Sequence, residues 1–282
     1  MEPGEPRPRR FGRREALGLG ILGAAGAGTA AVFAIGGRDL PRSSRLAAPA
    51  AAQPHRHVPS PPASSAPPVP AAPVAVRSTP IRKISELLPG APANAVALTI
   101  DDGPHPEWTP RVLDLLAHYE VTATFCLIGE QIRANEKEVA MMVAAGHQVA
   151  NHTWTHPLNI NHLSRTRVDT EIERTYRQIV EVTGKNPHLF RAPGGNWSHA
   201  VYAATAQHGM YPLDWQVDPR DWSRPGTSRI IYRMLTAQPG DVLLCHDGGG
   251  DRSETIRALR TVIPQLKSRG LQFITLQPPG TH

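Results

Sequence analysis

From about residue 94 to the end of the chain, short runs of apolar and β-branched residues alternate with longer segments in which apolar residues recur every three or four positions. The longer segments predict helices; Val112, Leu115 and Leu116, for example, share one helix face. Strands that alternate with helices form parallel sheets, so the pattern predicts an α/β fold, either doubly wound or closed into a barrel. The short runs predict strands at 96–100, 123–128, 148–151, 189–192, 213–217, 242–245 and 272–276.

The first 40 residues have a different pattern. Residues 1–14 are polar and end in Arg13-Arg14, and the run 17–35 is apolar, free of charge and rich in Ala and Gly. A basic segment before an apolar run is typical of an export signal, and the arginine pair is typical of a twin-arginine signal. The apolar run is also just long enough to span a bilayer. We therefore assign 1–40 to an export signal or membrane anchor, and expect a protein that is secreted or associated with the cell envelope.

Residues 41–93 form a third region, rich in proline and alanine. Within it, 41–92 contains 13 prolines and 11 alanines. Such a composition cannot bury much apolar area, so it predicts an extended, disordered linker. The remaining residues, 94–282, would form one folded domain.

The net charge of +6 belongs to the N-terminal region. Residues 1–93 carry 12 of the Lys and Arg and 5 of the Asp and Glu, a net charge of +7, whereas 94–282 carries 18 and 19, a net charge of −1. A domain this close to neutral is not expected to bind nucleic acid. The two cysteines exclude a disulfide scaffold and a cysteine-based zinc site, and we expect both to be free, buried thiols.

Polar residues collect where five of the predicted strands end. In a parallel barrel these ends meet on one face, which is where such folds place active sites. The clusters are Asp101-Asp102, His152 with His156, Arg191, Asp221 and His246.

Two of these clusters suggest a metal site. His152 and His156 are four residues apart, so one helical turn would place both imidazoles on the same side. Two histidines and one carboxylate bind zinc or another borderline divalent ion. The alternatives are a solvated helix face for the histidines and an ordinary turn for Asp101-Asp102. If the site binds a metal, one of these aspartates completes it and the other can take a proton from water.

The other clusters supply a proton donor and its supports. His246 can act as the acid on the far side of the pocket. Arg191 and Asp221 are available to orient the base and the acid. Arg191 could instead be a structural ion-pair partner.

The order of these clusters resembles the signature of the polysaccharide deacetylase family and covers nearly all of 94–282. The matching motifs are Thr99-Ile100-Asp101-Asp102-Gly103-Pro104, His152-Thr153-Trp154-Thr155-His156, Arg191-Ala192-Pro193, Asp221-Trp222 and Leu244-Cys245-His246. The resemblance implies an irregular (β/α) barrel with seven parallel strands. It also implies metal-dependent hydrolysis of N- or O-acetyl groups on sugars, with 94–282 as the catalytic domain.

Carried over residue by residue, the resemblance implies Asp101 as general base, paired with Arg191. It implies His246 as general acid, tuned by Asp221. The ion, zinc first and cobalt or another borderline ion as alternatives, would be held by Asp102, His152 and His156.

The resemblance also implies a substrate-binding wall. Trp222 and Leu244 would line the acetyl pocket, and Pro193 and Gly194 would border the groove. The family usually has an aromatic residue after Arg-x-Pro, whereas Gly194-Gly195 stand here. The backbone N–H survives this change and the ring does not, so the shape of the groove, and with it substrate choice, is the part that the resemblance does not carry over.

The leading hypothesis is an exported deacetylase of acetylated sugars, acting on peptidoglycan first, with chitin oligomers or acetylated xylan as alternatives. The alternatives from other classes are a catalytically silent, glycan-binding module of the cell wall and an amidohydrolase acting on small non-peptide C–N bonds. We expect a polysaccharide as the partner, no nucleic acid, membrane contact only through 1–40, and a monomer.

Overall fold

A computed structural model describes residues 71–278. The predicted export signal or membrane anchor at 1–40, and most of the predicted linker, lie outside the described residues. Within 71–278, no helix combines the length and the apolar character needed to cross a membrane.

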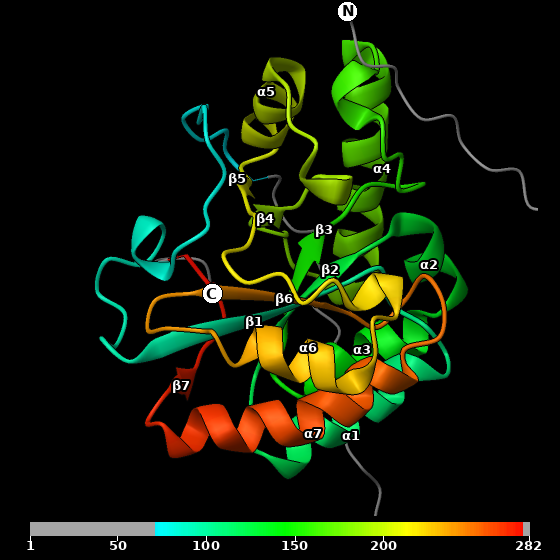
Figure 1. Cartoon of the computed structure of the whole chain (residues 1–282). Coiled ribbons are helices and arrows are strands. Elements are labelled where there is room, and N and C mark those ends of the chain that lie inside the picture. The colour runs from blue at the N-terminus through cyan, green and yellow to red at the C-terminus, as the bar shows by residue number, and fades with distance from the viewer. Residues whose placement is uncertain (1–70, 279–282) are drawn as a thin grey trace, which may run out of the picture. The chain divides into compact units, whose positions relative to one another are not determined.

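The domain is built on a curved sheet in which every strand pair is parallel (Figure 1). The strands run in the order β5-β4-β3-β2-β1-β6, and the short β7 pairs with the beginning of β1. The expected irregular α/β barrel with seven parallel strands is confirmed. The strands are β1 (Ala95–Asp101), β2 (Thr124–Leu127), β3 (Gln148–Asn151), β4 (Leu189–Phe190), β5 (Tyr211–Pro212), β6 (Val242–His246) and β7 (Gln272–Phe273).

Helices lie between the strands, as the alternating pattern predicts. They are α1 (Trp108–His118), α2 (Gly129–Ala134), α3 (Glu136–Ala144), α4 (Arg165–Thr183), α5 (His199–Gln207), α6 (Thr227–Met234) and α7 (Ser253–Ser268). Apolar residues of α1, α3, α6 and α7 share one hydrophobic cluster with Val96, Leu98 and Ile100 of β1. These helices therefore cover the outer face of the sheet.

Strand β1 is buried on both faces and carries the first site residue at its end. Its alternate residues Ala95 and Ala97 point inward and belong to a second, smaller apolar cluster. Because side chains alternate along a strand, Asp101 points to the same inner side as Ala97. The barrel interior thus changes from small apolar residues at one end to carboxylates at the other.

The segment before β1 belongs to the fold, although its composition predicts a linker. Ile81, Ile84 and Leu87 are buried in the inner cluster. Ile81 also forms a parallel bridge with Leu213, just after β5. The predicted boundary at residue 93 is therefore wrong, because an amphipathic segment inside the Pro/Ala-rich region packs into the barrel.

The fifth predicted strand, 213–217, is also misplaced. Regular strand pairing ends with β5, at Pro212. Within 213–217 there are only isolated bridges, of Leu213 with Ile81 and of Val217 with Leu243 of β6. The amide of Asp214 donates to the carbonyl of Ile81 at 2.7 Å. The first bridge joins the chain beyond β5 to the segment before β1 and the second joins it to β6, so the barrel closes irregularly rather than through a regular strand.

The two cysteines are free and buried, as expected. Cys126 of β2 faces the inner cluster and Cys245 of β6 faces the outer one. The two thiols therefore lie on opposite faces of the sheet, and strand β1 separates their strands. Burial raises the pKa of both thiols well above the ordinary value, which keeps them protonated.

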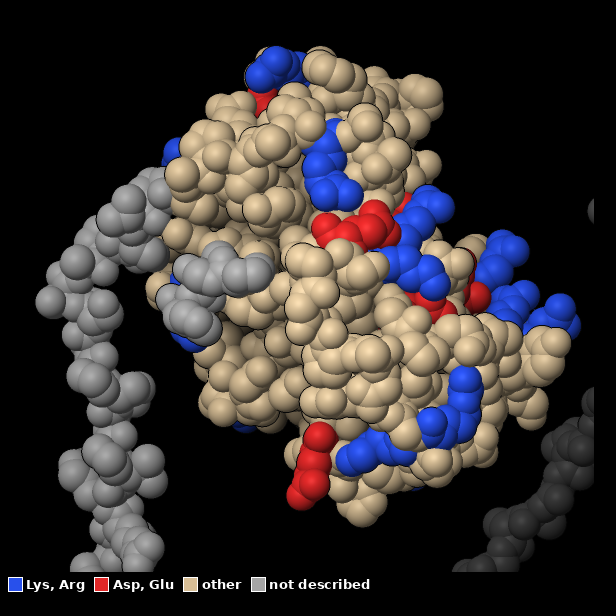
Figure 2. All heavy atoms as spheres, turned by 90° about the vertical axis from the view of Figure 1, so that its left-hand side faces the viewer, with Lys and Arg blue, Asp and Glu red and all other residues tan. Residues whose placement is uncertain are grey.

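Figure 2 shows one face of the domain, turned by a right angle from Figure 1. On this face Lys and Arg side chains stand beside Asp and Glu, separated by wide uncharged areas. The mixed charges agree with the near-neutral balance of the domain sequence.

Candidate active site

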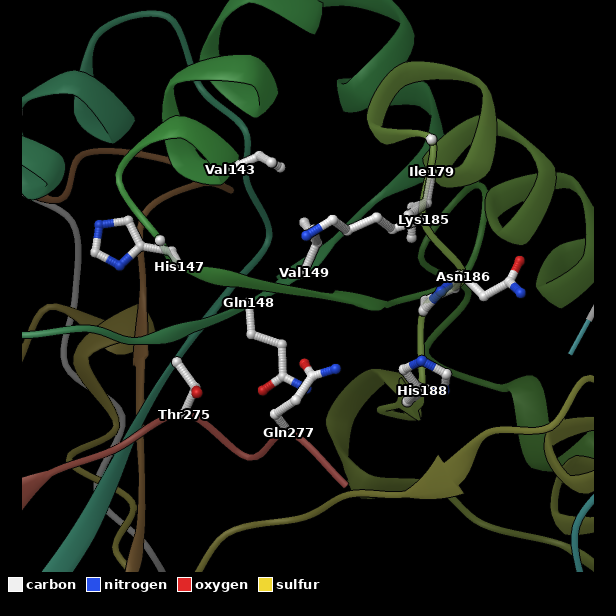
Figure 3. Close-up of a pocket in the computed structure, with 13 residues that line it drawn as sticks. Val143, His147, Gln148, Val149, Ile179, Lys185, Asn186, His188, Thr275 and Gln277 are labelled. Atoms are coloured by element: carbon white, nitrogen blue, oxygen red, sulfur yellow. The ribbon is translucent and has the colours of Figure 1, made fainter. Parts of the chain in front are cut away.

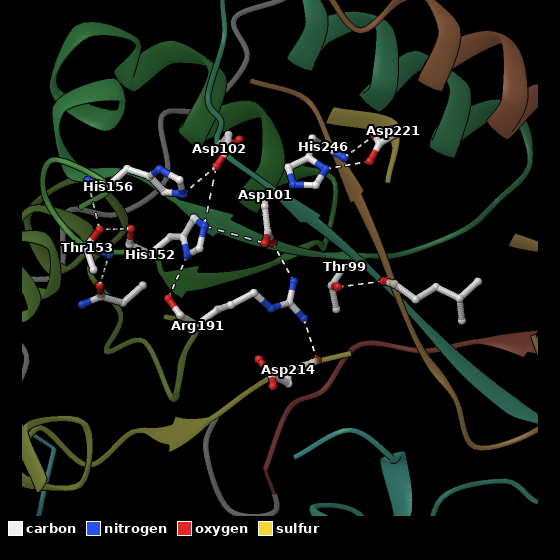
Figure 4. Close-up of polar contacts among 12 residues, drawn as sticks. Thr99, Asp101, Asp102, His152, Thr153, His156, Arg191, Asp214, Asp221 and His246 are labelled. Atoms are coloured by element: carbon white, nitrogen blue, oxygen red, sulfur yellow. Dashed lines mark hydrogen bonds and ion pairs between the residues drawn. The ribbon is translucent and has the colours of Figure 1, made fainter. Parts of the chain in front are cut away.

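The site lies at the carboxyl ends of the strands (Figure 4). Asp101 is the last residue of β1 and His246 the last of β6, and the two are register partners. His152 follows directly after β3, and Arg191 directly after β4. Asp221 joins them through a contact with His246. The structure therefore brings the predicted clusters together.

Asp102, His152 and His156 form a group that could hold a metal ion. Their ligand atoms lie within 4.8 Å of one another. Oδ1 of Asp102 is 3.6 Å from Nε2 of His152 and 3.3 Å from Nε2 of His156. This oxygen is buried and has no hydrogen-bond partner among residues 71–278. A buried carboxylate oxygen that faces two imidazole nitrogens fits a divalent cation.

The backbone fixes which nitrogen of His152 faces Asp102. Nδ1 of His152 lies 2.8 Å from the carbonyl oxygen of Arg191. A carbonyl can only accept, so Nδ1 carries the proton and donates it. Nε2 is then the nitrogen that faces Asp102, which is the orientation that a metal-binding histidine needs.

The local charges favour the protonation states that bind a cation. Burial raises the pKa of the Asp102 carboxyl, but the contact with His152 and the charge of His246 lower this pKa by more. The pKa of Asp102 is therefore well below its ordinary value. Burial, together with the charge of His152, lowers the pKa of His156 to about 4. Asp102 is therefore ionised and His156 neutral at pH 7, the forms that ligate metals.

The segment between the two histidines is not the helical turn that their spacing suggests. It is an irregular turn in which Thr153 and His156 have positive φ angles of 68° and 58°. Such angles are uncommon outside glycine. The rings of His152 and His156 still lie with their centroids 4.9 Å apart. The two histidines do share one side, but a strained turn places them there rather than a helix.

Asp101 belongs to a buried ion pair beside this group. Nη1 of Arg191 donates to Oδ1 of Asp101 at 2.6 Å, and Nη2 donates to the carbonyl of Asp214 at 2.9 Å. Burial lowers the pKa of the Arg191 guanidinium, but the carboxylate of Asp101 raises it more. Oδ2 of Asp101 lies 3.7 Å from Nε2 of His152. One oxygen of Asp101 is thus held, and the other faces the ligand group.

His246 and Asp221 form the second buried pair. Nδ1 of His246 lies 2.7 Å from Oδ1 of Asp221, whose Oδ2 accepts from the backbone N–H of His246 and from the hydroxyl of Thr255. Burial would lower the pKa of His246, but the hydrogen bond and charge of Asp221 raise it to about 9. His246 is therefore an imidazolium at pH 7. Because Nδ1 donates to Asp221, the proton available for transfer is on Nε2.

The residues predicted to bind substrate lie beside these pairs. Leu244 precedes His246 by two residues on β6, so both side chains are on the same face of the sheet. Trp222 follows Asp221, and half of its surface, 50%, is exposed. Pro193 is buried and Gly194 exposed in the turn after β4. Their roles toward substrate stay predictions.

The turn that lacks the family's aromatic residue packs against Trp215. A Cβ on Gly195 would lie 3.2 Å from Cη2 of Trp215, and the φ angle of this glycine is +67°. The Trp215 ring is also 5.5 Å from the guanidinium carbon of Arg191. Trp197 stacks on Tyr202, and its Nε1 donates to Oδ1 of Asp214 at 3.1 Å. Trp215 is thus the aromatic residue that contacts Gly195.

Sequence reasoning missed three buried residues near the site. The carbonyl of Asp214 holds Arg191, but the residue lies inside the misplaced fifth strand. Asp247 is fully buried after β6; burial and the charges of Asp102 and Asp101 raise its pKa to about 7. The third, Glu171, is a buried carboxylate on the apolar face of α4, and a charge at such a position is the signal that could have identified it.

A cavity of about 550 Å³ lies away from this site (Figure 3). Its lining includes His147 and Gln148 at the start of β3 and His188 just before β4. These residues are at the amino ends of the strands, whereas His152 and Arg191 follow their carboxyl ends. No predicted site residue lines the cavity.

Residues 89–213 match the family profile described as polysaccharide deacetylase. The chain is similar to a peptidoglycan-N-acetylglucosamine deacetylase of Bacillus cereus, with 39% identity over 184 residues, covering 64% of this chain and 85% of that protein. It is also similar to a chitooligosaccharide deacetylase of a Bradyrhizobium species, with 41% identity over 201 residues, covering 67% of this chain and 90% of that protein.

A similar solved structure is that of a CE4 family pseudoenzyme from Bacillus anthracis. It is 32% identical, with a TM-score of 0.60, and the match covers 64% of this chain and 63% of that chain. The matched region thus spans less than two thirds of that solved chain. Because a pseudoenzyme shares this fold, the fold alone does not establish catalytic activity, which has to be inferred from the side chains of the site.

Proposed function

The chain belongs to the polysaccharide deacetylase family, and on that premise we propose that it hydrolyses N-acetyl groups of glucosamine units in an extracellular polysaccharide with the help of a divalent metal ion. The observation that carries this proposal is the convergence of two buried pairs on one ligand group. Asp101, which pairs with Arg191, ends β1, and His246, which pairs with Asp221, ends the neighbouring β6. Asp102 directly follows Asp101.

Asp102, His152 and His156 would hold the ion. One carboxylate oxygen and two imidazole nitrogens suit zinc, with cobalt or another borderline ion as alternatives. When bound, the ion would polarise the acetyl carbonyl and lower the pKa of water.

The chain's own residues would move the protons. Asp101 takes a proton from the attacking water as the new C–O bond forms, while Arg191 keeps its carboxylate in place. His246 gives the proton on Nε2 to the leaving nitrogen as the C–N bond breaks. The products are acetate and a free amine. A backbone N–H in the turn after Pro193 would support the developing oxyanion.

We propose the cell envelope as the location and peptidoglycan as the first substrate. The basic segment, the apolar run 17–35 and the Pro/Ala-rich stretch after it support export followed by tethering near the wall. The curated relatives named above act on peptidoglycan and on chitooligosaccharides, so chitin oligomers are the second candidate substrate. Replacing both Arg13 and Arg14 by lysine should keep the protein in the cytoplasm, as measured by cell fractionation. Unchanged export of this variant would contradict a twin-arginine signal.

An acetate-release screen tests the activity. Metal-stripped protein, before and after addition of zinc or cobalt, is assayed on peptidoglycan, chitin oligomers and acetylated xylan. Activity should require the metal and be lost in Asp101→Asn and His246→Ala. Asp114→Asn, which changes an exposed carboxylate on α1, should keep it and serves as the charge-matched control. Undiminished activity in either site variant would overturn the assigned roles.

Two other outcomes would select the alternative functions. Glycan binding without acetate release by the metal-loaded protein would indicate a silent binding module, as the similarity to a pseudoenzyme allows. Release of acetate only from small non-sugar amides would indicate an amidohydrolase.

A further inference from the structure

We propose that Glu171 is a positioning residue for the metal site: it fixes the turn between His152 and His156 and thereby sets the affinity for a divalent cation. This inference rests on the ligand set of the proposed function. Glu171 lies in the middle of α4 and contributes no ligand atom of its own.

The carboxylate of Glu171 accepts hydrogen bonds from the turn through both oxygens. Oε2 accepts from the backbone N–H groups of Trp154 at 3.0 Å and Thr155 at 2.8 Å, and Oε1 accepts from the hydroxyl of Thr155 at 2.9 Å. Glu171 is only 5% exposed. A carboxylate accepts at both oxygens, and its charge strengthens these hydrogen bonds.

The same turn is held from its other side by the start of α2. The backbone N–H of Gly129 donates to the carbonyl of Thr153 at 2.9 Å, and that of Glu130 donates to the carbonyl of Trp154 at 3.1 Å. The Trp154 ring packs on Gly129 so closely that a Cβ there would lie 2.2 Å from Cε3. Helix α2 thus takes the carbonyls of the turn, and Glu171 takes its amides.

Two further hydrogen bonds complete the turn. Oδ1 of Asn151 accepts from the N–H of Thr153 at 3.0 Å, and Oγ1 of Thr153 accepts from the N–H of His156 at 3.1 Å. These bonds hold Thr153 and His156 in their left-handed conformation. Such backbone costs free energy and persists only where the surroundings over-determine it.

Loss of the Glu171 carboxylate would leave the amides of Trp154 and Thr155 without their acceptor. The strained turn would then relax, and His156 would lose its place 3.3 Å from Asp102. His152 is anchored separately, by the end of β3 and the carbonyl of Arg191. The expected defect is therefore the loss of one ligand out of three.

Metal titration of the full-length, metal-stripped protein tests this inference. Zinc binding is measured by calorimetry, and cobalt binding by its visible absorption spectrum, which reports the ligand geometry. Glu171→Ala should weaken binding by about 10- to 100-fold, the range for partners that orient metal ligands. Glu171→Gln should be affected less, because one amide oxygen can still accept from both N–H groups while the NH₂ faces the Thr155 hydroxyl.

Gln148→Ala is the matched control. Gln148 is also buried and has three hydrogen bonds, to the hydroxyl of Thr124 and to the N–H and carbonyl of Leu276, but it begins β3 and lies far from the ligands. The Gln148→Ala substitution should lower the melting temperature and leave the affinity for the metal unchanged. Equal loss of affinity in Gln148→Ala and Glu171→Ala would show a general effect of stability and overturn the inference.

The remaining outcomes are separable. Tight metal binding by Glu171→Ala with an unchanged cobalt spectrum would overturn this inference alone. A wild-type protein that binds neither ion would overturn the proposed ligand set and this inference with it. If Glu171→Ala does not fold, as judged by circular dichroism, the comparison of Glu171→Gln with the wild type and Gln148→Ala decides the question in the same way.

Discussion

Replacing Asp221 with asparagine should remove the acid function of His246 in a pH-dependent way. The hydrogen bond and negative charge of Asp221 are the main reasons why the pKa of His246 is about 9 rather than 6.5. Asparagine removes the charge, and the burial of His246, which is 8% exposed, then dominates and lowers the pKa. We expect it to fall to about 6.5 or below, a loss of about 3 kcal/mol in the stabilisation of the imidazolium.

The kinetic effect follows from the fraction of His246 that carries its proton. With a pKa of about 9, roughly 90% of His246 is protonated at pH 8; with a pKa of about 6.5, only about 3% is. Because only the protonated form can act as the acid, kcat/KM of Asp221→Asn should be about 30-fold lower at pH 8 and less than about twofold lower at pH 6.

The assay is acetate release from N-acetylglucosamine oligomers by the metal-loaded enzyme across the pH range, with Asp114→Asn as control. The basic limb of the kcat/KM profile should move from near pH 9 to near pH 6.5 in Asp221→Asn and stay in place in the control. A loss of the same size at every pH would refute the reasoning, because it would show that Asp221 acts through structure rather than through the charge of His246.

Three further predictions concern stability, each measured by urea unfolding of the metal-free protein. The raised pKa of His246 stabilises the fold fully below pH 6.5, and this contribution is lost as pH rises through about 9, so the wild type should lose about 3 kcal/mol over that range relative to His246→Gln. Arg191→Met leaves Asp101 buried and unpaired and should cost about 3–5 kcal/mol. Ile84→Ala should cost about 2–5 kcal/mol, whereas a residue in a disordered linker would cost almost nothing.

The positions of the site residues could be predicted because they depend on local sequence. Asp101 and His246 end buried strands, and His152 and Arg191 directly follow theirs. Parallel strands in one sheet bring their carboxyl ends together. The positions of the strands alone are therefore enough to predict that these residues share one site, whatever the arrangement of the helices.

The conformation of the metal-binding turn could not be predicted in the same way. The spacing of His152 and His156 suggests a helix, but the turn is held by Glu171 and by the first amides of α2, which lie far from it in the sequence. Such contacts between distant segments override the local preference for a helix, and they cannot be predicted from the spacing of the two histidines.

Composition misled the assignment of the segment before β1. Proline and alanine dominate 41–93, and this average hides Ile81, Ile84 and Leu87, which recur every three residues and pack into the barrel. The misplaced fifth strand has the same origin, because Leu213 and Asp214, directly after β5, bond to Ile81 rather than to a regular strand.

The irregular closure of the barrel links the segment before β1 to the proposed catalytic base. The carbonyl of Ile81 accepts from the amide of Asp214, the carbonyl of Asp214 accepts from Arg191, and Arg191 donates to Asp101. Three hydrogen bonds thus connect the carbonyl of Ile81 to the carboxylate that would activate water. A pull from the preceding chain would therefore be shared between this path and the contacts that Ala71 and Val74 make with α4 and α5.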